Sequence, residues 1–320
     1  MGTQTYDKNS NCPQGFSYSQ RIYTTSADGG NAGKYYVFDT KLEGQDLRHF
    51  AKGLSNAKPF TLSFYVKCNI NRVFTCELRD LDNNRMCVQQ YTTTDSNWKR
   101  YVLTFPADTT GQFNSDNGAS LWVRFWLSAG ANFKSGTSQT TWGSVSDANI
   151  CPGQTGDLGG RVGDYWYVTG VQLEVGDTAT PYEHRSFTDE LSRCQRYFVR
   201  TNFTSHCTAY FGGTHLFRQI QFVCPTPMRA QPSFSVTGNE GATTKFTIKT
   251  WSSDQNMTAT PNAVHLHHVD YVHGTGNGAV HSLAVGIDFS SGNSGIPPNG
   301  PGNHNAYACR MYGANLDAEL

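Results

Sequence analysis

The sequence has few charged side chains and no long apolar run. Charged residues make up 16% of the 320 residues, against roughly 25% in an ordinary soluble domain, and 25 basic side chains balance 25 acidic ones. Without an excess of positive charge, we expect no electrostatic capture of nucleic acid. No stretch approaches the ~18 apolar residues of a membrane-spanning helix, so we expect no membrane insertion. Residues 1–6 lack the charged and apolar regions of a signal peptide, which predicts assembly in a cytosol.

The common catalytic motifs are also missing. There is no Gly-x-Ser-x-Gly nucleophile elbow, no Gly-x-x-x-x-Gly-Lys-Ser/Thr phosphate loop and no His-Glu-x-x-His zinc helix. We therefore expect a protein that is not an enzyme and needs no cofactor. A glycan hydrolase stays an alternative, because the separation of about 5 to 9 Å between its paired carboxylates is a tertiary property.

The nine cysteines match no zinc ribbon or finger, and no Cys-x-x-Cys pair occurs. We expect mostly reduced thiols that are buried or half-buried. One disulfide stays an alternative, since Cys68 and Cys76 flank residues 69–72 of a predicted hairpin, where they would face each other across two strands.

Short runs of β-branched and aromatic residues recur between clusters of Gly, Asn, Asp and Pro, while helical periodicity is almost absent. This pattern predicts an all-β protein. The clearest strands are predicted at residues 61–67, 73–78, 99–105, 121–127 and 165–175, and further strands at 196–201, 208–211, 215–223, 245–251, 264–272, 280–289 and 307–311.

Neither face of the strand predicted at residues 121–127 is polar enough to be assigned to solvent. Its even positions carry Trp122, Arg124 and Trp126, and its odd positions are apolar, so we expect it between two layers or under a loop. A polar stretch at 128–163 then forms a connection long enough to be typical of a functional or interface segment.

A domain boundary is predicted near residue 187. Thr188 precedes Asp189 and Glu190, a pattern typical of an N-cap followed by the first turn of a short helix. We therefore predict a jelly-roll β-sandwich at 1–187 and a smaller β-sandwich domain at 188–320.

Several segments resemble bacteriophage tail-fibre and other phage structural proteins. Residues 168–176 (Val-Thr-Gly-Val-Gln-Leu-Glu-Val-Gly), 179–183 (Ala-Thr-Pro-Tyr-Glu) and 194–198 (Cys-Gln-Arg-Tyr-Phe) resemble their signature in order and spacing. Residues 42–45 and 57–64, with Trp98 and Trp142, resemble the family's jelly-roll domain, which is similar to carbohydrate-binding modules. Downstream, residues 225–232 and 316–320 resemble segments that also recur in such fibres. The resemblance covers nearly the whole chain.

The resemblance implies a virion protein: a homotrimeric tail fibre or adhesin that binds host cell-surface polysaccharide and assembles with other phage tail or capsid proteins. Family members often carry a particle-anchoring segment before the jelly roll, whereas here the jelly roll begins almost at Met1. A capsid decoration protein (head fibre) or a tail structural protein without glycan binding therefore stays an alternative.

The signature also has a physical interpretation of its own. Val171, Leu173 and Val175 alternate with Gln172 and Glu174, as in a strand with one core face. We therefore expect these residues to be scaffold rather than binding site.

Trp142, in the polar 128–163 stretch, is the best candidate for stacking on a sugar ring. Asn132 and Gln139 supply hydrogen-bonding groups nearby, and Tyr91 would join them from a strand end. The alternative is that Trp142 pins its loop to the core. The other tryptophans in strand patterns are expected in the core or at an interface: Trp98, Trp122, Trp126 and Trp166.

Two segments suggest metals, although we predict none. His265 and His267 share one strand face, where a trimer would gather three such pairs. Asp80 and Asp82 lie two apart in a turn that would suit calcium, but they lack the register of an EF-hand loop. Surface or interface histidines and an ordinary hairpin turn are the simpler interpretations.

Overall fold

The computed structural model describes the backbone of residues 3–28, 30–208, 210–212, 215–236, 246–250, 253–258, 263–271, 280–290 and 306–318. Side chains are described for residues 3–28, 30–200, 223–233 and 315–318. Internal contacts divide the chain after His184, close to the boundary predicted at residue 187. We treat the two units separately.

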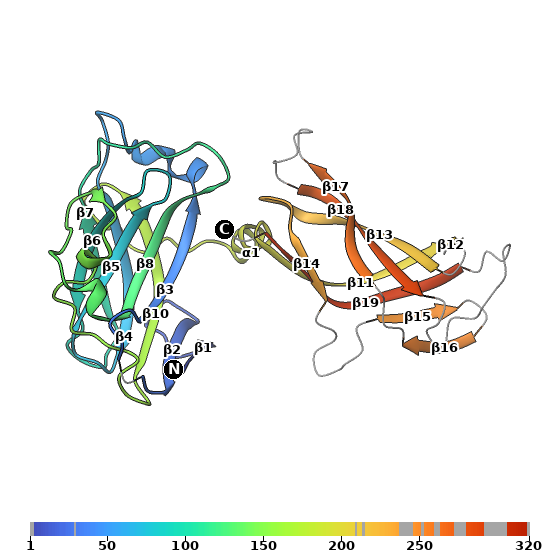
Figure 1. The fold of residues 1–320 in the computed structure, drawn as a ribbon, viewed down its shortest axis with the longest axis horizontal. Helices are drawn as coiled ribbons and strands as arrows, with labels where there is room; N and C mark the ends of the chain where they lie inside the picture. Colours follow the sequence, from blue (N-terminus) through green and yellow to red (C-terminus); the bar gives the residue numbers. More distant parts are fainter. Residues whose placement is uncertain are drawn as a thin grey trace. The chain divides into compact units, whose positions relative to one another are not determined.

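The first unit is a jelly-roll β-sandwich of two antiparallel sheets (Figure 1), as predicted. The first sheet has the order β1 (Thr3–Asn9), β2 (Ser19–Ser26), β10 (Tyr165–Val175), β4 (Phe60–Cys68) and β7 (Lys99–Phe105). The second has the order β3 (Tyr35–Glu43), β8 (Ala119–Ala129), β5 (Val73–Asp80), β6 (Arg85–Thr92) and β9 (Gly143–Ser144). The loops described in the first unit contain the 3-10 helices η1 (Gly44–Phe50), η2 (Ala131–Phe133) and η3 (Asp147–Asn149).

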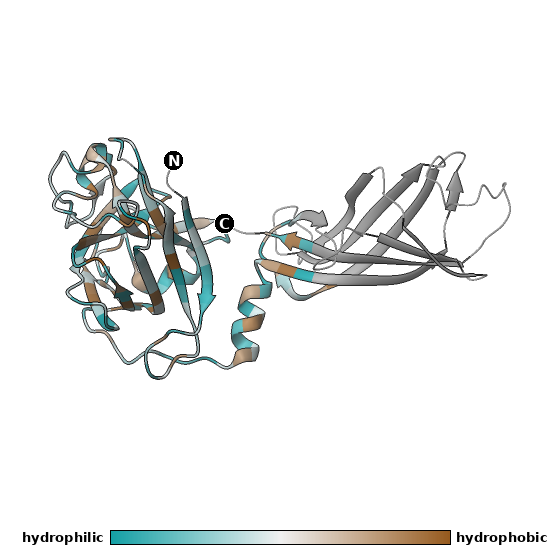
Figure 2. Ribbon diagram, turned by 90° about the horizontal axis from the view of Figure 1, so that it is seen from below, coloured by the Kyte–Doolittle hydropathy of each residue, from teal (hydrophilic) through white to brown (hydrophobic). Residues whose placement is uncertain are grey.

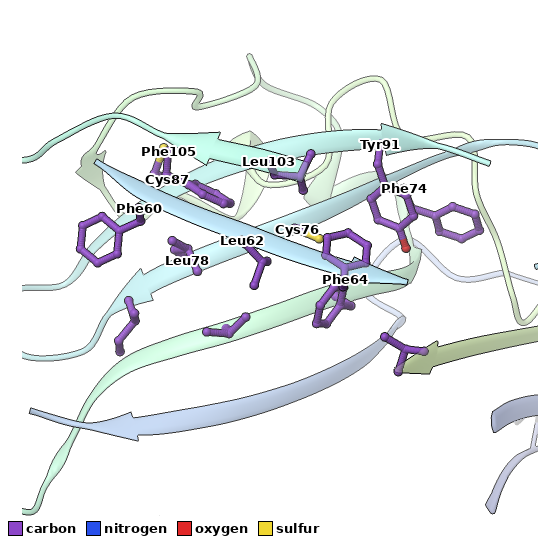
Figure 3. Packing of buried hydrophobic residues seen from close by; sticks show 14 of the residues in the cluster. Phe60, Leu62, Phe64, Phe74, Cys76, Leu78, Cys87, Tyr91, Leu103 and Phe105 are labelled. Carbon is purple, nitrogen blue, oxygen red and sulfur yellow. The ribbon is translucent and has the colours of Figure 1, made fainter. Parts of the chain in front are cut away.

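The hydrophobic core lies between these two sheets. Phe60, Leu62 and Phe64 of β4 contribute from the first sheet, and Phe125 of β8 from the second; all four are at most 2% exposed. Figure 3 shows side chains of β4, β5 and β7 gathered between the strands. The odd positions of β8 point inward, so the outer face of the second sheet carries its even positions, Trp122, Arg124 and Trp126.

The predicted hairpin around residues 69–72 is wrong. Strand β4 belongs to the first sheet and β5 to the second, so residues 69–72 carry the chain across the sandwich. Cys68 and Cys76 are both buried free thiols, and burial raises the pKa of Cys68 to about 12. The described cysteines form no disulfide, as expected for reduced thiols.

The second unit begins with α1 (Phe187–Gln195) and continues as two antiparallel sheets. One has the order β11 (Phe198–Thr208), β19 (Ala306–Asp317), β15 (Phe246–Thr250) and β16 (Ser253–Thr258), with β14 (Ser233–Val236) also paired to β19. The other has the order β12 (Tyr210–Gly212), β13 (His215–Met228), β18 (Val280–Ser290) and β17 (Ala263–Tyr271). The predicted all-β class is confirmed.

Helix α1 begins earlier than predicted. Ser186, not Thr188, is the N-cap, and its Oγ accepts a hydrogen bond from the Asp189 backbone N–H at 3.2 Å. Apolar and polar residues alternate along the helix (Figure 2), and its Phe187 is 80% exposed. Within the described residues, no helix is both long and apolar enough to cross a membrane.

Candidate functional site

Trp142 lies in the interior rather than on a sugar-binding surface. Trp142 is 9% exposed, and its Nε1 donates a hydrogen bond to the carbonyl oxygen of Pro106 at 2.8 Å. The centroids of the Trp142 and Phe60 rings lie 5.7 Å apart. The stacking prediction for Trp142 is therefore corrected, because the ring packs in the core. The alternative, in which Trp142 pins its loop to the core, is confirmed.

The other three predicted site residues do not gather around Trp142. Tyr91 is buried, its hydroxyl accepts from Trp166 Nε1 at 3.0 Å, and burial raises its pKa well above the usual value. Gln139 donates to the carbonyl oxygens of Met86 and Ser144, so its amide fixes backbone. Asn132 is exposed. A site made of these four residues is not present.

The turn at residues 80–84 uses its acids for internal contacts. Asp80 is buried against Lys52 and accepts hydrogen bonds from the Asn83 side chain, whereas Asp82 accepts from the backbone and side chain of Asn114. Within the side chains described, no group of three or more His, Cys, Asp or Glu could hold a metal ion. His265 and His267 lie in β17, and their side chains fall outside the described residues.

A buried lysine joins three segments at this end of the sandwich. Lys52 Nζ lies 2.5 Å from Asp80 Oδ2 and 3.1 Å from Asp108 Oδ2, and it donates to the carbonyl oxygens of Thr110 and Gly111 at 3.1 and 2.7 Å. We call these five residues the Lys52 cage. Both charged side chains of the Lys52–Asp80 pair are 0% exposed, so they stabilise only while paired.

We expect the first unit to lose stability at acid pH, in part through Asp108. Burial raises the pKa of Asp108, but hydrogen bonds from Arg85 and Lys52 outweigh it and leave the pKa below its ordinary value. A lowered pKa in the folded state stabilises fully above the unfolded value of about 3.9, and the contribution is lost as pH falls through the folded pKa. The free energy of unfolding, measured with urea between neutral pH and about pH 2.5, should therefore fall less steeply with falling pH in Asp108→Asn than in the wild type. Equal slopes would contradict this role.

The signature residues hold the chain as it leaves the sandwich. Glu174 accepts hydrogen bonds from the Thr180 backbone N–H at 3.2 Å and hydroxyl at 2.5 Å. Gln172 accepts from the Glu183 backbone N–H at 2.8 Å, and Arg100 donates to the Thr180 carbonyl oxygen. The expectation that Gln172 and Glu174 are scaffold is confirmed.

The predicted alternation along this strand is only partly correct. Leu173 packs against the core, but Val171 and Val175 are 39% and 36% exposed. The register of β10 against β4 shifts between Thr169 and Gln172, and Gly170 has a φ of 59°. A Cβ at Gly170 would lie 2.6 Å from Phe16 Cζ, so this bulge requires glycine.

The long 128–163 segment covers part of the outer face of the second sheet. Beneath it, Trp126 packs with Phe133, Ile150, Cys151 and Met86 in a second buried cluster. The expectation that β8 lies under a loop is confirmed for its Trp126 end. The Trp122 end is half-buried.

Glu77 binds side chains on the outer face of the second sheet, between Trp122 and Trp126. It is 0% exposed; its Oε1 accepts from Arg79 Nε at 2.6 Å, and its Oε2 accepts from Arg124 Nη1 at 3.1 Å and Trp126 Nε1 at 2.8 Å. Three donors therefore bind one carboxylate, and both of its oxygens accept. This fixes the Arg79 and Arg124 side chains beside Trp122.

Trp122 is surrounded by cations. Lys41 of β3 and Arg79 of β5 lie directly opposite it on the two flanking strands. The Arg124 guanidinium carbon lies 4.1 Å from the centroid of the indole, Lys41 Nζ 5.3 Å and the Arg79 guanidinium carbon 6.0 Å. These distances are those of cation–π contacts.

Two more side chains extend this surface along β3. Tyr35 is 49% exposed, with its ring 5.1 Å from Phe133, and Asp39 Oδ2 lies 3.7 Å from Arg124 Nε. Asn132 lies near the start of β3: its Nδ2 is 3.6 Å from the point where a Cβ added to Gly33 would lie, and Gly33 precedes Tyr35 by two residues. We name this surface the β3–β8 platform; it consists of Tyr35, Asp39, Lys41, Arg79, Trp122 and Arg124.

Two buried donors of the platform have no hydrogen-bond partner: Trp122 Nε1 and Arg124 Nε. Both atoms lie below the surface, and a buried donor left unpaired costs about 1–3 kcal/mol. Aromatic rings combined with polar groups are what the apolar face and the hydroxyls of a sugar require. The platform therefore has the chemistry of a glycan-binding surface.

The strand pattern predicts Trp122 in the core or at an interface and predicts no role for Arg124. The signal was present as the alternation Trp122, Arg124, Trp126 on the face of β8 opposite the apolar one. The sequence of the strand does not show whether a loop covers its Trp122 end or its Trp126 end.

No family model matches the chain, and no curated protein matches it in sequence. Among solved structures, it is similar to a family 16 carbohydrate-binding module at 10% identity and a TM-score of 0.27, with 53% of this chain and 84% of that chain covered. A family 11 carbohydrate-binding module of a Clostridium thermocellum cellulosomal cellulase matches at 11% identity and a TM-score of 0.29, with 57% and 86% covered.

The enzymatically active domain of tailspike protein 4 from bacteriophage CBA120 is similar at 13% identity and a TM-score of 0.29, over 54% of this chain and 18% of that chain. At these identities and TM-scores the similarities do not identify a ligand or an activity for the chain.

Proposed function

We propose that this chain is a bacteriophage virion protein of the tail-fibre class, which binds host surface glycan through the β3–β8 platform and catalyses no reaction. The observation that carries glycan binding is the half-buried indole of Trp122, set among three cations on the outer face of the second sheet. The phage origin, the virion location and the trimer rest on the sequence resemblance.

A fibre compensates for weak single sites by carrying several copies. Sugar binding at one shallow platform is weak, and a trimer with three platforms raises the effective concentration of each further site once the first is bound. Homotrimers on one particle would therefore attach firmly to a repeating polysaccharide.

A structural particle protein is the second candidate. Phe187 and Leu191 are four residues apart on α1 and are 80% and 42% exposed, which would suit packing on a neighbouring subunit in a capsid decoration or tail protein. In that role the protein would bind no glycan.

Replacing Trp122 with alanine is expected to weaken binding of the full chain to bacterial cells by at least about tenfold, which is the scale of a central aromatic contact. Binding to a panel of intact strains is measured before and after periodate oxidation of surface glycans. Trp98→Ala is the matched control: Trp98 lies just before β7 of the first sheet, is also half-buried and donates to Asn11 Oδ1 at 3.1 Å.

Binding that is sensitive to periodate, lost in Trp122→Ala and kept in Trp98→Ala would support the proposal. Assembled oligomer that binds no strain would overturn it in favour of the structural role. Release of reducing sugar from the cell-surface polysaccharide would identify a glycan hydrolase instead.

A further inference from the structure

We infer that the first unit has a second carbohydrate site, a cavity at the η1 end of the sandwich that takes one terminal sugar residue. The cavity has a volume of about 240 Å³ and lies between residues 44–54, which include η1, and the loop 112–115. It shares no residue with the β3–β8 platform. The inference therefore goes beyond the proposed function and adds a separate site with its own ligand.

Part of the cavity wall is apolar. Leu47, Ala51 and Leu54 line it from one side, and Phe113 lines it from the opposite loop. Leu54 is 42% exposed, so this apolar surface continues to the rim. An aromatic ring among aliphatic side chains suits the apolar face of a pyranose ring.

Three exposed polar side chains also line the cavity, and together they both donate and accept hydrogen bonds. Arg48 only donates, while the amide of Gln112 and the hydroxyl of Ser115 each donate and accept. Arg48 Nη2 lies 3.5 Å from the carbonyl oxygen of Ser115, so the guanidinium reaches from η1 to the opposite loop. Sugar hydroxyls match this mixture, whereas an apolar ligand would displace water from these groups without replacing its hydrogen bonds.

The size of the cavity favours a single ring. Cavities that bind drug-sized ligands measure roughly 300–1,000 Å³. A cavity of about 240 Å³ takes a smaller ligand than those. A terminal sugar residue needs space for one ring only, while the middle of a polysaccharide chain needs a longer groove.

The cavity walls are held in place by contacts within the protein. Asn83 Nδ2 donates to the carbonyl oxygen of Gln112 at 2.9 Å, and Asp82 accepts from the backbone and side chain of Asn114 at 2.9 and 2.8 Å. Gly53 has a φ of 84°, and a Cβ added to it would lie 2.4 Å from the Gln112 backbone nitrogen. Because the walls are already fixed, binding costs little ordering of the protein.

Lys52 also lines the cavity, but its ammonium is committed to the Lys52 cage. Nζ has four oxygen neighbours, from Asp80, Asp108, Thr110 and Gly111, and an ammonium has three donors. The cage therefore fixes the base of the cavity and leaves Lys52 no donor to offer. Recognition of sugar hydroxyls falls to the three exposed polar side chains.

The test measures binding of single sugars to the full chain. The probes are methyl glycosides of common hexoses, 6-deoxyhexoses, N-acetylhexosamines and uronic acids, followed by saturation-transfer NMR. We expect at least one of them to bind with a dissociation constant on the order of 1 mM, which is the scale for so small a ligand.

The variants are Arg48→Ala and Gln112→Ala, with Arg72→Ala as the matched control. Arg72 is also exposed, but it follows the last residue of β4, whereas the cavity segment 44–54 precedes the first. We expect each cavity variant to weaken binding about tenfold, and Arg72→Ala and Trp122→Ala to leave it unchanged. Both cavity side chains are exposed, so the variants should fold, and urea unfolding of each variant checks this.

Every other result counts against the site. If no methyl glycoside binds at millimolar concentration, or if neither cavity variant weakens binding, the inference is overturned. Binding that is lost in Trp122→Ala and kept in both cavity variants would place the sugar on the platform and would also overturn it. The proposed function is tested apart from this, by the binding of Trp122→Ala to cells, so either can fail while the other stands.

Discussion

Replacing Lys52 with alanine is expected to lower the free energy of unfolding of the first unit by about 3–5 kcal/mol. The substitution leaves the buried carboxylates of Asp80 and Asp108 without the ammonium that lies 2.5 and 3.1 Å from them. Two carbonyl oxygens, those of Thr110 and Gly111, lose their donor at the same time. The cost is large because the partners stay buried after the cation is gone.

Urea unfolding followed by tryptophan fluorescence measures this change, since five of the six tryptophans lie before residue 184. Lys58→Ala is the matched control, because Lys58 is exposed and should change the free energy by no more than about 0.5 kcal/mol. Lys52→Met separates charge from volume: if it restores wild-type stability, the packing of the side chain matters and the cage does not.

Replacing Glu77 with alanine should cost a similar amount, about 3–5 kcal/mol, and should also disorder the platform. The change removes the one carboxylate that binds Arg79, Arg124 and Trp126 together. Arg124 is 5% exposed, so its charge would remain buried without a hydrogen-bonded partner.

Glu77→Gln refines the interpretation because its amide oxygen keeps one acceptor for Trp126 Nε1, while the charge and the second acceptor oxygen are lost. We expect its unfolding free energy to fall between those of the wild type and Glu77→Ala, with glycan binding reduced in both variants. Glu183→Ala, at an exposed glutamate of the same unit, serves as the control for urea unfolding. A Glu77→Ala variant as stable as this control would show that the network adds nothing.

Strand positions in this chain could be predicted because they follow from local patterns. The run at 165–175 and the run at 99–105 both have the same bounds in the structure, since β-branched and aromatic residues alternate there between turn residues. The partnership of strands was not predictable in the same way: residues 69–72 have the composition of a hairpin turn, yet they connect two different sheets.

The candidate site illustrates the same limit. Trp142 lies in a polar loop, and its sequence context predicts exposure. In the structure its ring packs against Lys52 and Phe60, which come from distant segments. Trp122 stands in a strand and looks buried, but the covering loop reaches Trp126 and leaves Trp122 half-buried.

By itself, the sequence determined the all-β class, the main strands, the approximate domain boundary and the scaffold role of Gln172 and Glu174. These depend on side-chain periodicity and turn chemistry within about ten residues. Only the tertiary structure decided which tryptophans are buried, that Lys52 binds oxygens of Asp80 and of residues 108–111, and that Arg79 and Arg124 share Glu77. Burial and charge pairing are set by neighbours that the fold brings together from far along the chain, and no local pattern encodes them.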